Sequence, residues 1–284
     1  MNRRLLILGA SLAAAAALVG ASALAGAPPS TIGSPQLHAL TDVNFISVCK
    51  FSHRRSDDPI VFFRHPNLSH DHEFFGATTT NAYSTPKKLR VSPTTCDRTE
   101  DTAAYWAPTV LLHNQPVIPI EAWAWYRRNT IEPVRAYPPG LKIVAGNSHA
   151  TSPQSTNVVF WNCSNDEVSP SVAIPTCPDA TANSLRVHVH FPDCWDGQHT
   201  DSPDHKSHMA YSVHGRCPAA HPFAVPALTV VIQYPITGGA GVTLSAMNSK
   251  LTGHADFVNA WQQAGLNRLV QFCLNALRTC GHAD

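Results

Sequence analysis

The stretch Leu185-Arg-Val-His-Val-His-Phe191 alternates apolar and polar residues over its whole length. Side chains two positions apart share one face of a strand, so this period of two predicts a β-strand. Its apolar face carries Leu185, Val187, Val189 and Phe191. Its polar face carries Arg186, His188 and His190, which we expect to be solvated rather than catalytic.

Other apolar runs along the chain favour the same fold class. Residues 59–63, 104–112 and 227–234 are short apolar segments broken by Pro, Asn and Gly, as is typical of strands and turns. In residues 254–280 the apolar positions recur every three or four residues, which predicts an amphipathic helix. We therefore expect a mainly β, sandwich-like single domain over residues 42–284, with long loops and this C-terminal amphipathic helix.

The N-terminus has the three parts of a secretory signal peptide. A positive start at residues 2–4 precedes the apolar residues 5–20, and Ala23-Leu24-Ala25 offers a small-x-small cleavage site. We predict a signal peptide at residues 1–25 and a flexible leader at residues 26–41. No later segment approaches ~20 uninterrupted apolar residues, so we expect a secreted, extracytoplasmic protein without a stable membrane span.

All eight cysteines lie beyond the predicted signal peptide. An even number of cysteines in an oxidising compartment favours four disulfides that staple the domain. Among about 105 connectivities, we favour pairing between neighbours because it closes the shortest loops. The expected pairs are Cys49 with Cys96, Cys163 with Cys177, Cys194 with Cys217 and Cys273 with Cys280.

Charge and motif content argue against several classes of protein. Lys and Arg number 20 against 19 Asp and Glu, and the aromatic residues do not stand within basic runs, which disfavours a nucleic-acid partner. The sequence contains no G-x-S-x-G, H-E-x-x-H or P-loop pattern and no dinucleotide fingerprint after a strand. Serine esterase, zincin, Rossmann oxidoreductase and NTPase functions are therefore unsupported.

Three segments place histidine beside carboxylate: Ser69-His-Asp-His-Glu-Phe-Phe-Gly76, residues 191–211 and Gly253-His-Ala-Asp-Phe257. With Asp58-Pro-Ile-Val61, they make the chain resemble the secreted fungal and bacterial domain-of-unknown-function family nineteen-ninety-six, whose pattern prefers Asp where Glu73 stands. The resemblance carries over no catalytic residue, because the family's activity is unassigned. It implies a polysaccharide context, since fungal members often adjoin carbohydrate-binding modules of the WSC type.

Metal ligation is the first chemistry that these segments predict. The predicted ligands are His70, His72, His205 and His208, and Asp196, His254 and Asp256 are additional candidates. His70 and His72 share one side of an extended segment, and His205 and His208 are neighbours on a helix. Such a set suits zinc, manganese or iron better than calcium. The alternative is a structural role, in which the histidines donate hydrogen bonds to loop carbonyls.

Acid/base chemistry without a metal is the second prediction, with Asp193, Asp204, His208 and Tyr211 as catalytic candidates. Asp193, Asp196 and Asp204 could supply the carboxylate pair of a glycoside hydrolase. In a β-elimination, His208 or Tyr211 would instead act as the base, with Lys206 or Arg186 binding a uronate carboxylate. The alternative is that the aspartates only form turns.

Tryptophans suggest how a polysaccharide would be held. Trp123 and Trp125 stand beside Tyr126, and one of the two is a candidate for an exposed platform on which a sugar ring stacks. We therefore predict a polysaccharide- or cell-wall-directed hydrolase or lyase with a His/Asp site. The rival hypothesis is a non-catalytic glycan-binding or cell-wall structural protein.

Overall fold

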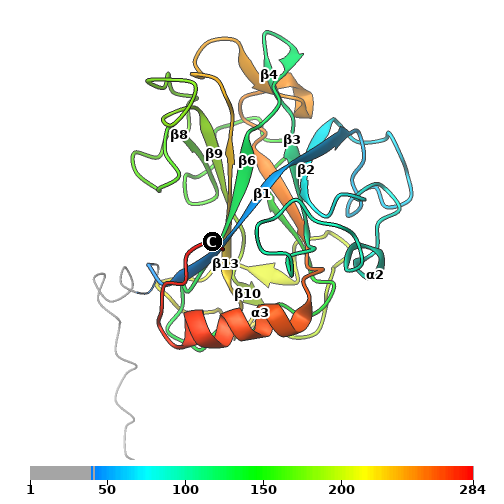
Figure 1. Ribbon diagram of the computed structural model, residues 1–284, viewed down its shortest axis with the longest axis vertical. Helices are drawn as coiled ribbons and strands as arrows, with labels where there is room; N and C mark the ends of the chain where they lie inside the picture. The colour runs from blue at the N-terminus through cyan, green and yellow to red at the C-terminus, as the bar shows by residue number, and fades with distance from the viewer. Residues whose placement is uncertain (1–39, 41, 284) are drawn as a thin grey trace, which may run out of the picture. The chain divides into compact units, whose positions relative to one another are not determined.

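The alternating stretch forms β9 (Arg186–His190), near one edge of a nine-stranded antiparallel sheet (Figure 1). The computed structural model describes Leu40 and residues 42–283. The strands of the sheet lie in the order β7-β15-β3-β2-β1-β6-β13-β9-β8. Their bounds are β1 (Asn44–Arg55), β2 (His72–Gly76), β3 (Ala104–Pro108), β6 (Glu121–Arg127), β7 (Lys142–Gly146), β8 (Val159–Asn162), β13 (Ala227–Gln233) and β15 (His254–Val258).

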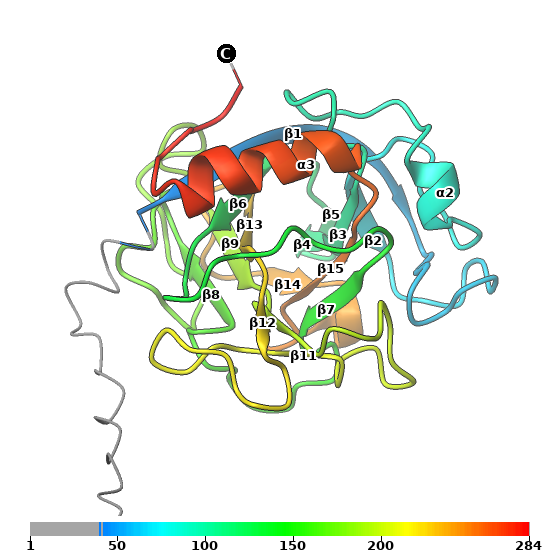
Figure 2. The same ribbon diagram turned by 90° about the horizontal axis from the view of Figure 1, so that it is seen from below.

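This sheet curls until it is nearly closed, and its inner face surrounds the hydrophobic core (Figure 2). The long strand β1 joins the two halves, because it pairs with β6 along residues 44–50 and with β2 along residues 51–55. Inside the curl, Phe45 stacks on Tyr126 with ring centroids 4.7 Å apart, and the edge of Trp261 meets both rings. The mainly β fold is therefore confirmed, with its core between facing halves of one sheet.

The C-terminal helix is confirmed but shorter than predicted. It consists of α3 (Gln263–Leu269), continued by the π-helix η2 (Val270–Asn275), and lies across the lower end of the sheet in Figure 1. Residues 254–258 form β15 instead, because Ala255 and Phe257 enter the core while His254 and Asp256 point away from it. The helical period begins only after this segment, whose apolar residues recur every two positions.

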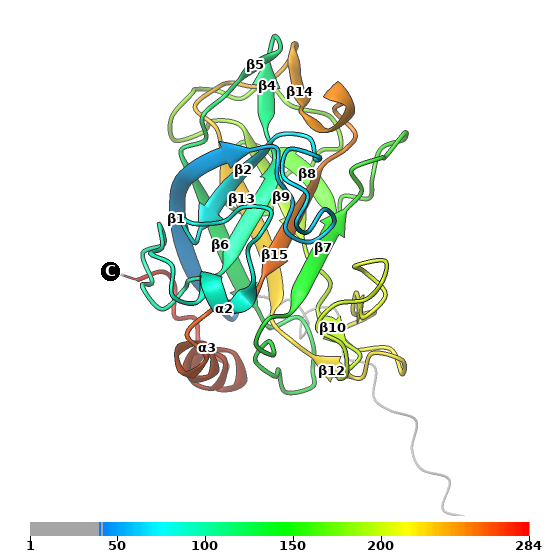
Figure 3. The same cartoon turned by 90° about the vertical axis from the view of Figure 1, so that its right-hand side faces the viewer.

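Two three-stranded sheets lie at opposite ends of the large sheet (Figure 3). One consists of β10 (Cys194–Trp195), β11 (Met209–Ala210) and β12 (Phe223–Ala224). The other consists of β4 (Val110–Leu112), β5 (Gln115–Pro116) and β14 (Val242–Leu244). The remaining elements are α2 (Pro86–Leu89) and the short 3-10 helix η1 (Ala246–Asn248).

All four predicted disulfides are present, and they join each cysteine to its neighbour in sequence. The described residues belong to one domain. Among them, no helix has the length and apolar content needed to cross a membrane. The predicted signal peptide (1–25) and nearly all of the leader (26–41) lie outside the described residues.

Two local predictions are wrong. Residues 59–63 form turns rather than a strand, because Asp58 Oδ1 accepts hydrogen bonds from the backbone N–H groups of Ile60 and Val61. The polar face of β9 is covered rather than solvated. His188 is fully buried and its Nε2 lies 2.8 Å from Asn162 Oδ1, while Arg186 donates to the carbonyl of Ser184 at 2.8 Å.

Candidate functional site

Five residues on the outer face of the sheet form what we call the histidine–aspartate cluster: Asp58, His70, His72, His254 and Asp256. His72 projects from β2, and His254 and Asp256 project from β15, all on the side opposite the core. Residues 57–71 close over these strands and add Asp58 and His70. This loop is held there by Ile60, which is buried in a small apolar cluster with Phe74 and Trp106.

The ring nitrogens of the cluster converge. One nitrogen from each of His70, His72 and His254 lies within 4.8 Å of the other two, and the Nε2 atoms of His70 and His254 are 3.1 Å apart. Single donor atoms of Asp58, His72 and Asp256 also lie within 4.8 Å of one another. Because His72 belongs to both groups, three imidazoles and two carboxylates form one continuous set of donors.

Backbone carbonyls fix the orientation of two of the rings. His72 Nδ1 lies 3.0 Å from the carbonyl oxygen of Asp57, and His254 Nδ1 lies 2.7 Å from that of Thr252. A carbonyl oxygen only accepts hydrogen bonds, so both Nδ1 atoms carry the proton. The lone pair of each ring is therefore on Nε2, which is the usual arrangement of histidines that bind a metal.

The cluster also holds buried polar atoms without partners. Within the described part of the chain, His72 Nε2 and both carboxylate oxygens of Asp256 make no hydrogen bond. His72 is 0% exposed and Asp256 is 1% exposed. Leaving a buried polar group unpaired costs roughly 1–3 kcal/mol, so native structures rarely tolerate several together unless a water or an ion satisfies them.

Burial dominates the electrostatics of the cluster. It lowers the pKa of His70 to about 4 and that of His254 to about 3, and it lowers the pKa of His72 well below its usual value. Burial, with the nearby charge of Asp58, raises the pKa of Asp256. The three imidazoles are therefore neutral at physiological pH. His254, whose proton is on Nδ1, accepts a hydrogen bond at Nε2 from His70 Nε2, so only His72 Nε2 has an unengaged lone pair in the absence of an ion.

A cavity of about 220 Å³ adjoins the cluster. Asp58, His70, His254 and Asp256 form one part of its lining, and Ser148 and His149 form another. Lys206 is close enough for its charge to act on both His254 and Asp256, and its ammonium donates to the carbonyl of Gly146 at 2.6 Å. A ligand in this cavity would meet the imidazoles and carboxylates directly.

The remaining predicted ligands lie elsewhere. His205 Nδ1 contacts Asp201 Oδ1 at 2.8 Å, and His208 is buried with its Nε2 2.7 Å from the carbonyl of Lys142, so neither joins the cluster. Asp196 accepts from the backbone N–H of Gln198 and of His199. Asp204 accepts from the backbone N–H of Ser207, which lowers its pKa. These contacts fit the structural alternative for His208 and the turn alternative for both aspartates.

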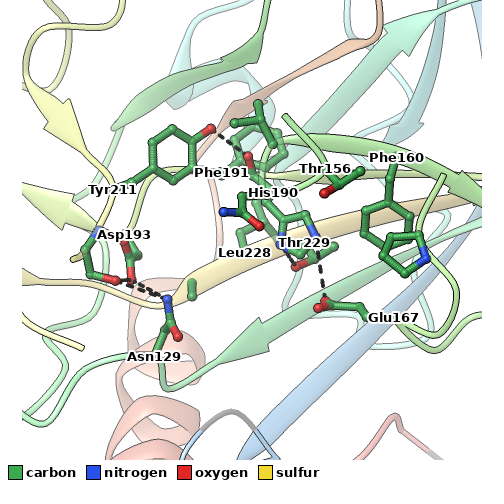
Figure 4. A pocket seen from close by; sticks show the side chains of 15 residues that line it. Asn129, Thr156, Phe160, Glu167, His190, Phe191, Asp193, Tyr211, Leu228 and Thr229 are labelled. Atoms are coloured by element: carbon green, nitrogen blue, oxygen red, sulfur yellow. Dashed lines mark hydrogen bonds and ion pairs between the residues drawn. The ribbon is translucent and has the colours of Figure 1, made fainter. Parts of the chain in front are cut away.

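Asp193 and Tyr211 line a second region, which we call the outer groove (Figure 4). It consists of two adjoining cavities of about 540 Å³ each, over the outer face of β6, β13 and β9. Asp193 is almost fully buried and accepts from Ser212 N, Ser212 Oγ and Asn129 Nδ2. Tyr211 donates its hydroxyl to the carbonyl of His190 at 2.9 Å.

These contacts bear on the predicted acid/base roles. Burial, followed by the charge of Asp193, raises the pKa of Tyr211, so the phenol stays protonated and is a poor base. The carboxylate of Asp193 already accepts three hydrogen bonds. Arg186 is also engaged, because its guanidinium donates to the carbonyls of Ala182 and Ser184. Asp193 and Tyr211 therefore lie together in the outer groove, and the acid/base roles predicted for them stay predictions.

The tryptophan platform differs from its prediction. Trp123 and Trp125 both lie on the outer face of β6, because residues two apart share a face, and their rings stack with centroids 6.2 Å apart. The guanidinium of Arg127 lies 4.5 Å from the ring centroid of Trp125. The two faces of the Trp125 ring are thus covered by Trp123 and Arg127. Tyr211, which is 39% exposed, has the more accessible ring.

Sequence reasoning missed Asp58 in the cluster and Asn129, Glu167 and His190 in the groove. Asp58 stands at the start of the Asp58-Pro-Ile-Val61 motif, which was a usable signal, but residues 59–63 were interpreted as a strand. No sequence pattern links Asn129, Glu167 and His190, because each comes from a different element or loop.

The family model for a domain of unknown function (DUF1996) matches residues 58–261. The chain therefore belongs to this family, which confirms the resemblance. The matched region includes every residue of the histidine–aspartate cluster. No protein of curated function and no solved structure matches the chain.

Proposed function

We propose that the histidine–aspartate cluster binds one divalent transition-metal ion and that the protein is a secreted, metal-dependent hydrolase or lyase acting on polysaccharide. The observation that carries the proposal is the convergence of buried, unpaired donors: His72 Nε2 and both oxygens of Asp256 lack partners among the described residues. A cation gives all of them a partner at once. It also offsets the cost of placing two carboxylates side by side in a buried site.

The donor types and spacing fit such an ion. In a tetrahedral zinc site, nitrogens about 2.1 Å from the ion lie roughly 3.4 Å from each other. The His70 and His254 Nε2 atoms, which share a hydrogen bond at 3.1 Å, are close enough together for one ion to replace the proton between them. Imidazole and carboxylate donors together suit zinc, manganese or iron, whereas calcium prefers oxygen donors alone.

A bound ion would supply the chemistry, by lowering the pKa of a water molecule or by polarising a substrate oxygen. His70, His72, His254 and Asp256 are the residues that would hold it. Asp58, the other carboxyl of the cluster, would accept the proton. For a lyase, the ion would instead neutralise a uronate carboxylate, and the nearby charge of Lys206 would assist it.

Export and a polysaccharide substrate belong to the same proposal. Four disulfides are consistent with an oxidising, extracellular environment. The signal-peptide pattern in residues 1–25 supports secretion. Polysaccharide is proposed because the family resemblance implies that context.

Metal analysis of the purified, disulfide-bonded protein tests the ion. We expect close to one equivalent of metal in the wild type and its loss in His72→Ala and His254→Ala. His65→Ala is the matched control, because His65 is an exposed residue of the same loop and should leave the metal content unchanged. Equal metal content in all four proteins would refute the site.

Polysaccharide cleavage tests the reaction. The metal-loaded protein should release new reducing ends from a polysaccharide, and an ultraviolet-absorbing unsaturated product would indicate a lyase rather than a hydrolase. His72→Ala should abolish either signal. If the metal-loaded protein binds polysaccharide but cleaves none, the enzymatic function is refuted and non-catalytic glycan binding replaces it.

A further inference from the structure

We propose that the outer groove is a separate binding site for a neutral oligosaccharide, with Tyr211 as the stacking platform. The proposal is independent of metal binding and of cleavage at the histidine–aspartate cluster. It rests on the shape of the groove, the state of its polar groups and its charge.

The groove combines two cavities of about 540 Å³ each, more than twice the volume of the cavity beside the histidine–aspartate cluster. Its two cavities share Asn129, Glu167, His190, Ala227 and Thr229, so they adjoin along the strands. Each has a volume within the range of about 300–1,000 Å³ typical of ligand sites. Two adjoining cavities suit a chain of several units better than one compact molecule.

The floor and walls of the groove are held rigidly. Arg127 donates to Glu167 at 2.8 Å and to Thr229 Oγ1 at 3.0 Å, and His190 Nδ1 lies 3.3 Å from the same hydroxyl. On the opposite wall, Asn129 Nδ2 donates to Asp193 at 3.2 Å. Figure 4 shows His190 between the Asp193 and Glu167 sides of the pocket. Planar polar side chains that are already fixed lose little entropy when they bind hydroxyl groups.

Tyr211 supplies an apolar surface beside these polar groups. Its hydroxyl is anchored to the carbonyl of His190 at 2.9 Å, while the residue remains 39% exposed. An anchored ring with an open surface suits the apolar face of a pyranose, and the surrounding amide, imidazole and carboxylate groups suit its hydroxyls.

Charge selects a neutral sugar over an acidic one. The single guanidinium of the groove, on Arg127, is paired with Glu167 and lies near the further carboxylates of Asp42 and Asp166. Asp193 adds another carboxyl on the far wall. A uronate or a phosphate would therefore approach a surplus of negative charge, and the only arginine available to it is already engaged within the described groove.

Calorimetric titration of the full chain tests this site. The probes are neutral oligosaccharides of glucose, mannose and N-acetylglucosamine, compared with oligogalacturonate. We expect at least one neutral series to bind and oligogalacturonate not to bind. Tyr211→Ala should weaken binding at least tenfold, whereas Tyr211→Phe, which keeps the ring, should weaken it only a few fold.

Matched variants separate the groove from other causes. Tyr83→Ala removes a similarly exposed tyrosine, at 49%, outside the groove and should leave affinity unchanged. Thr156→Trp should block binding by filling the groove without removing any hydrogen bond within the core. His72→Ala should bind the sugar normally even if it loses metal. The site is refuted if no neutral series binds, if oligogalacturonate binds as tightly, or if Tyr83→Ala weakens binding as much as Tyr211→Ala.

Discussion

The histidine–aspartate cluster and the outer groove occupy the outer face of the same sheet, but their buried carboxyl groups differ in hydrogen bonding. Asp193 and Asp256 are 2% and 1% exposed. Asp193 accepts hydrogen bonds from Ser212 and Asn129, whereas Asp256 has no partner among the described residues. The two carboxyl groups are nearly equally buried, so they differ in whether they have hydrogen-bond partners. An unpaired buried carboxylate calls for a cation, and a paired one belongs to a preformed surface.

Loops on the two halves of the sheet produce this difference. Over β2 and β15, residues 57–71 bring further imidazole and carboxylate groups and few donors for Asp256. Over β6, β13 and β9, the neighbouring segments bring amides and hydroxyls, such as those of Asn129 and Ser212, that satisfy the carboxylate of Asp193. The sheet is therefore a common support, and the covering loops decide which ligand chemistry each half can have.

Metal loading and the titration of Asp101 should change the free energy of unfolding most. If the ion binds only the folded state, a free concentration 1,000 times its Kd stabilises the protein by about 4 kcal/mol. For a domain of this size, that corresponds to a rise in Tm of roughly 8–16 °C. Differential scanning calorimetry with and without a chelator measures it. The rise should vanish in His72→Ala and persist in His65→Ala, and a rise that survives in His72→Ala would break the comparison.

Asp101, a third buried carboxyl, tests whether hydrogen-bond partners are enough to keep a buried carboxyl group ionised. Asp101 is 0% exposed and accepts from Tyr105 Oη at 2.8 Å and from Ala103 N at 3.1 Å, yet burial raises its pKa to about 7. Between about pH 4 and about pH 7 the folded state keeps a proton that the unfolded state has lost. The contribution of Asp101 to stability is therefore complete below about pH 4 and falls by roughly 4 kcal/mol as the pH rises through about 7.

Urea unfolding across this pH range measures the effect as the difference between wild type and Asp101→Asn. The asparagine cannot titrate, so the variant should lose much of the decline in stability between about pH 4 and about pH 7. Identical slopes in the two proteins would show that the partners of Asp101 hold it ionised despite burial.

Asp193→Ala should destabilise the protein by about 2–3 kcal/mol, because Ser212 N, Ser212 Oγ and Asn129 Nδ2 all lose an acceptor. Asp196→Ala is the matched control. Asp196 accepts local hydrogen bonds in an accessible turn, and its loss should cost less than about 1 kcal/mol. Equal losses in urea unfolding would mean that the groove wall is no better ordered than the turn.

Much of the fold could be predicted because its signals are local. The alternation in residues 185–191 predicted β9, and closing the shortest loops predicted all four disulfides. Residues 254–258 were assigned to a helix because apolar residues at two-residue spacing there run directly into a helical pattern. His188 was expected in solvent because no local signal shows that residues 162–184 fold over β9.

The candidate site was only partly predictable for a related reason. His70 and His72 are two positions apart in sequence, but they meet His254 only because β2 and β15 both pair with β3. His205 and His208 are histidines three positions apart, a spacing that many metal-binding pairs have. In the structure they contact Asp201 and the carbonyl of Lys142 instead. Sequence gives the donor types, whereas the order of strands in the sheet decides which donors meet.

Asp256→Asn gives the smallest effect and the most direct test of the comparison, because its sign should be opposite to that of Asp193→Ala. In metal-free protein the substitution replaces a buried carboxyl without partners, next to Asp58, by a neutral amide of the same shape. We expect a gain of about 1–2 kcal/mol in urea unfolding without metal. With metal, the same variant should bind the ion at least tenfold more weakly. A loss of stability in the metal-free variant would show that Asp256 is already satisfied, and the main reason for placing a cation beside it would be gone.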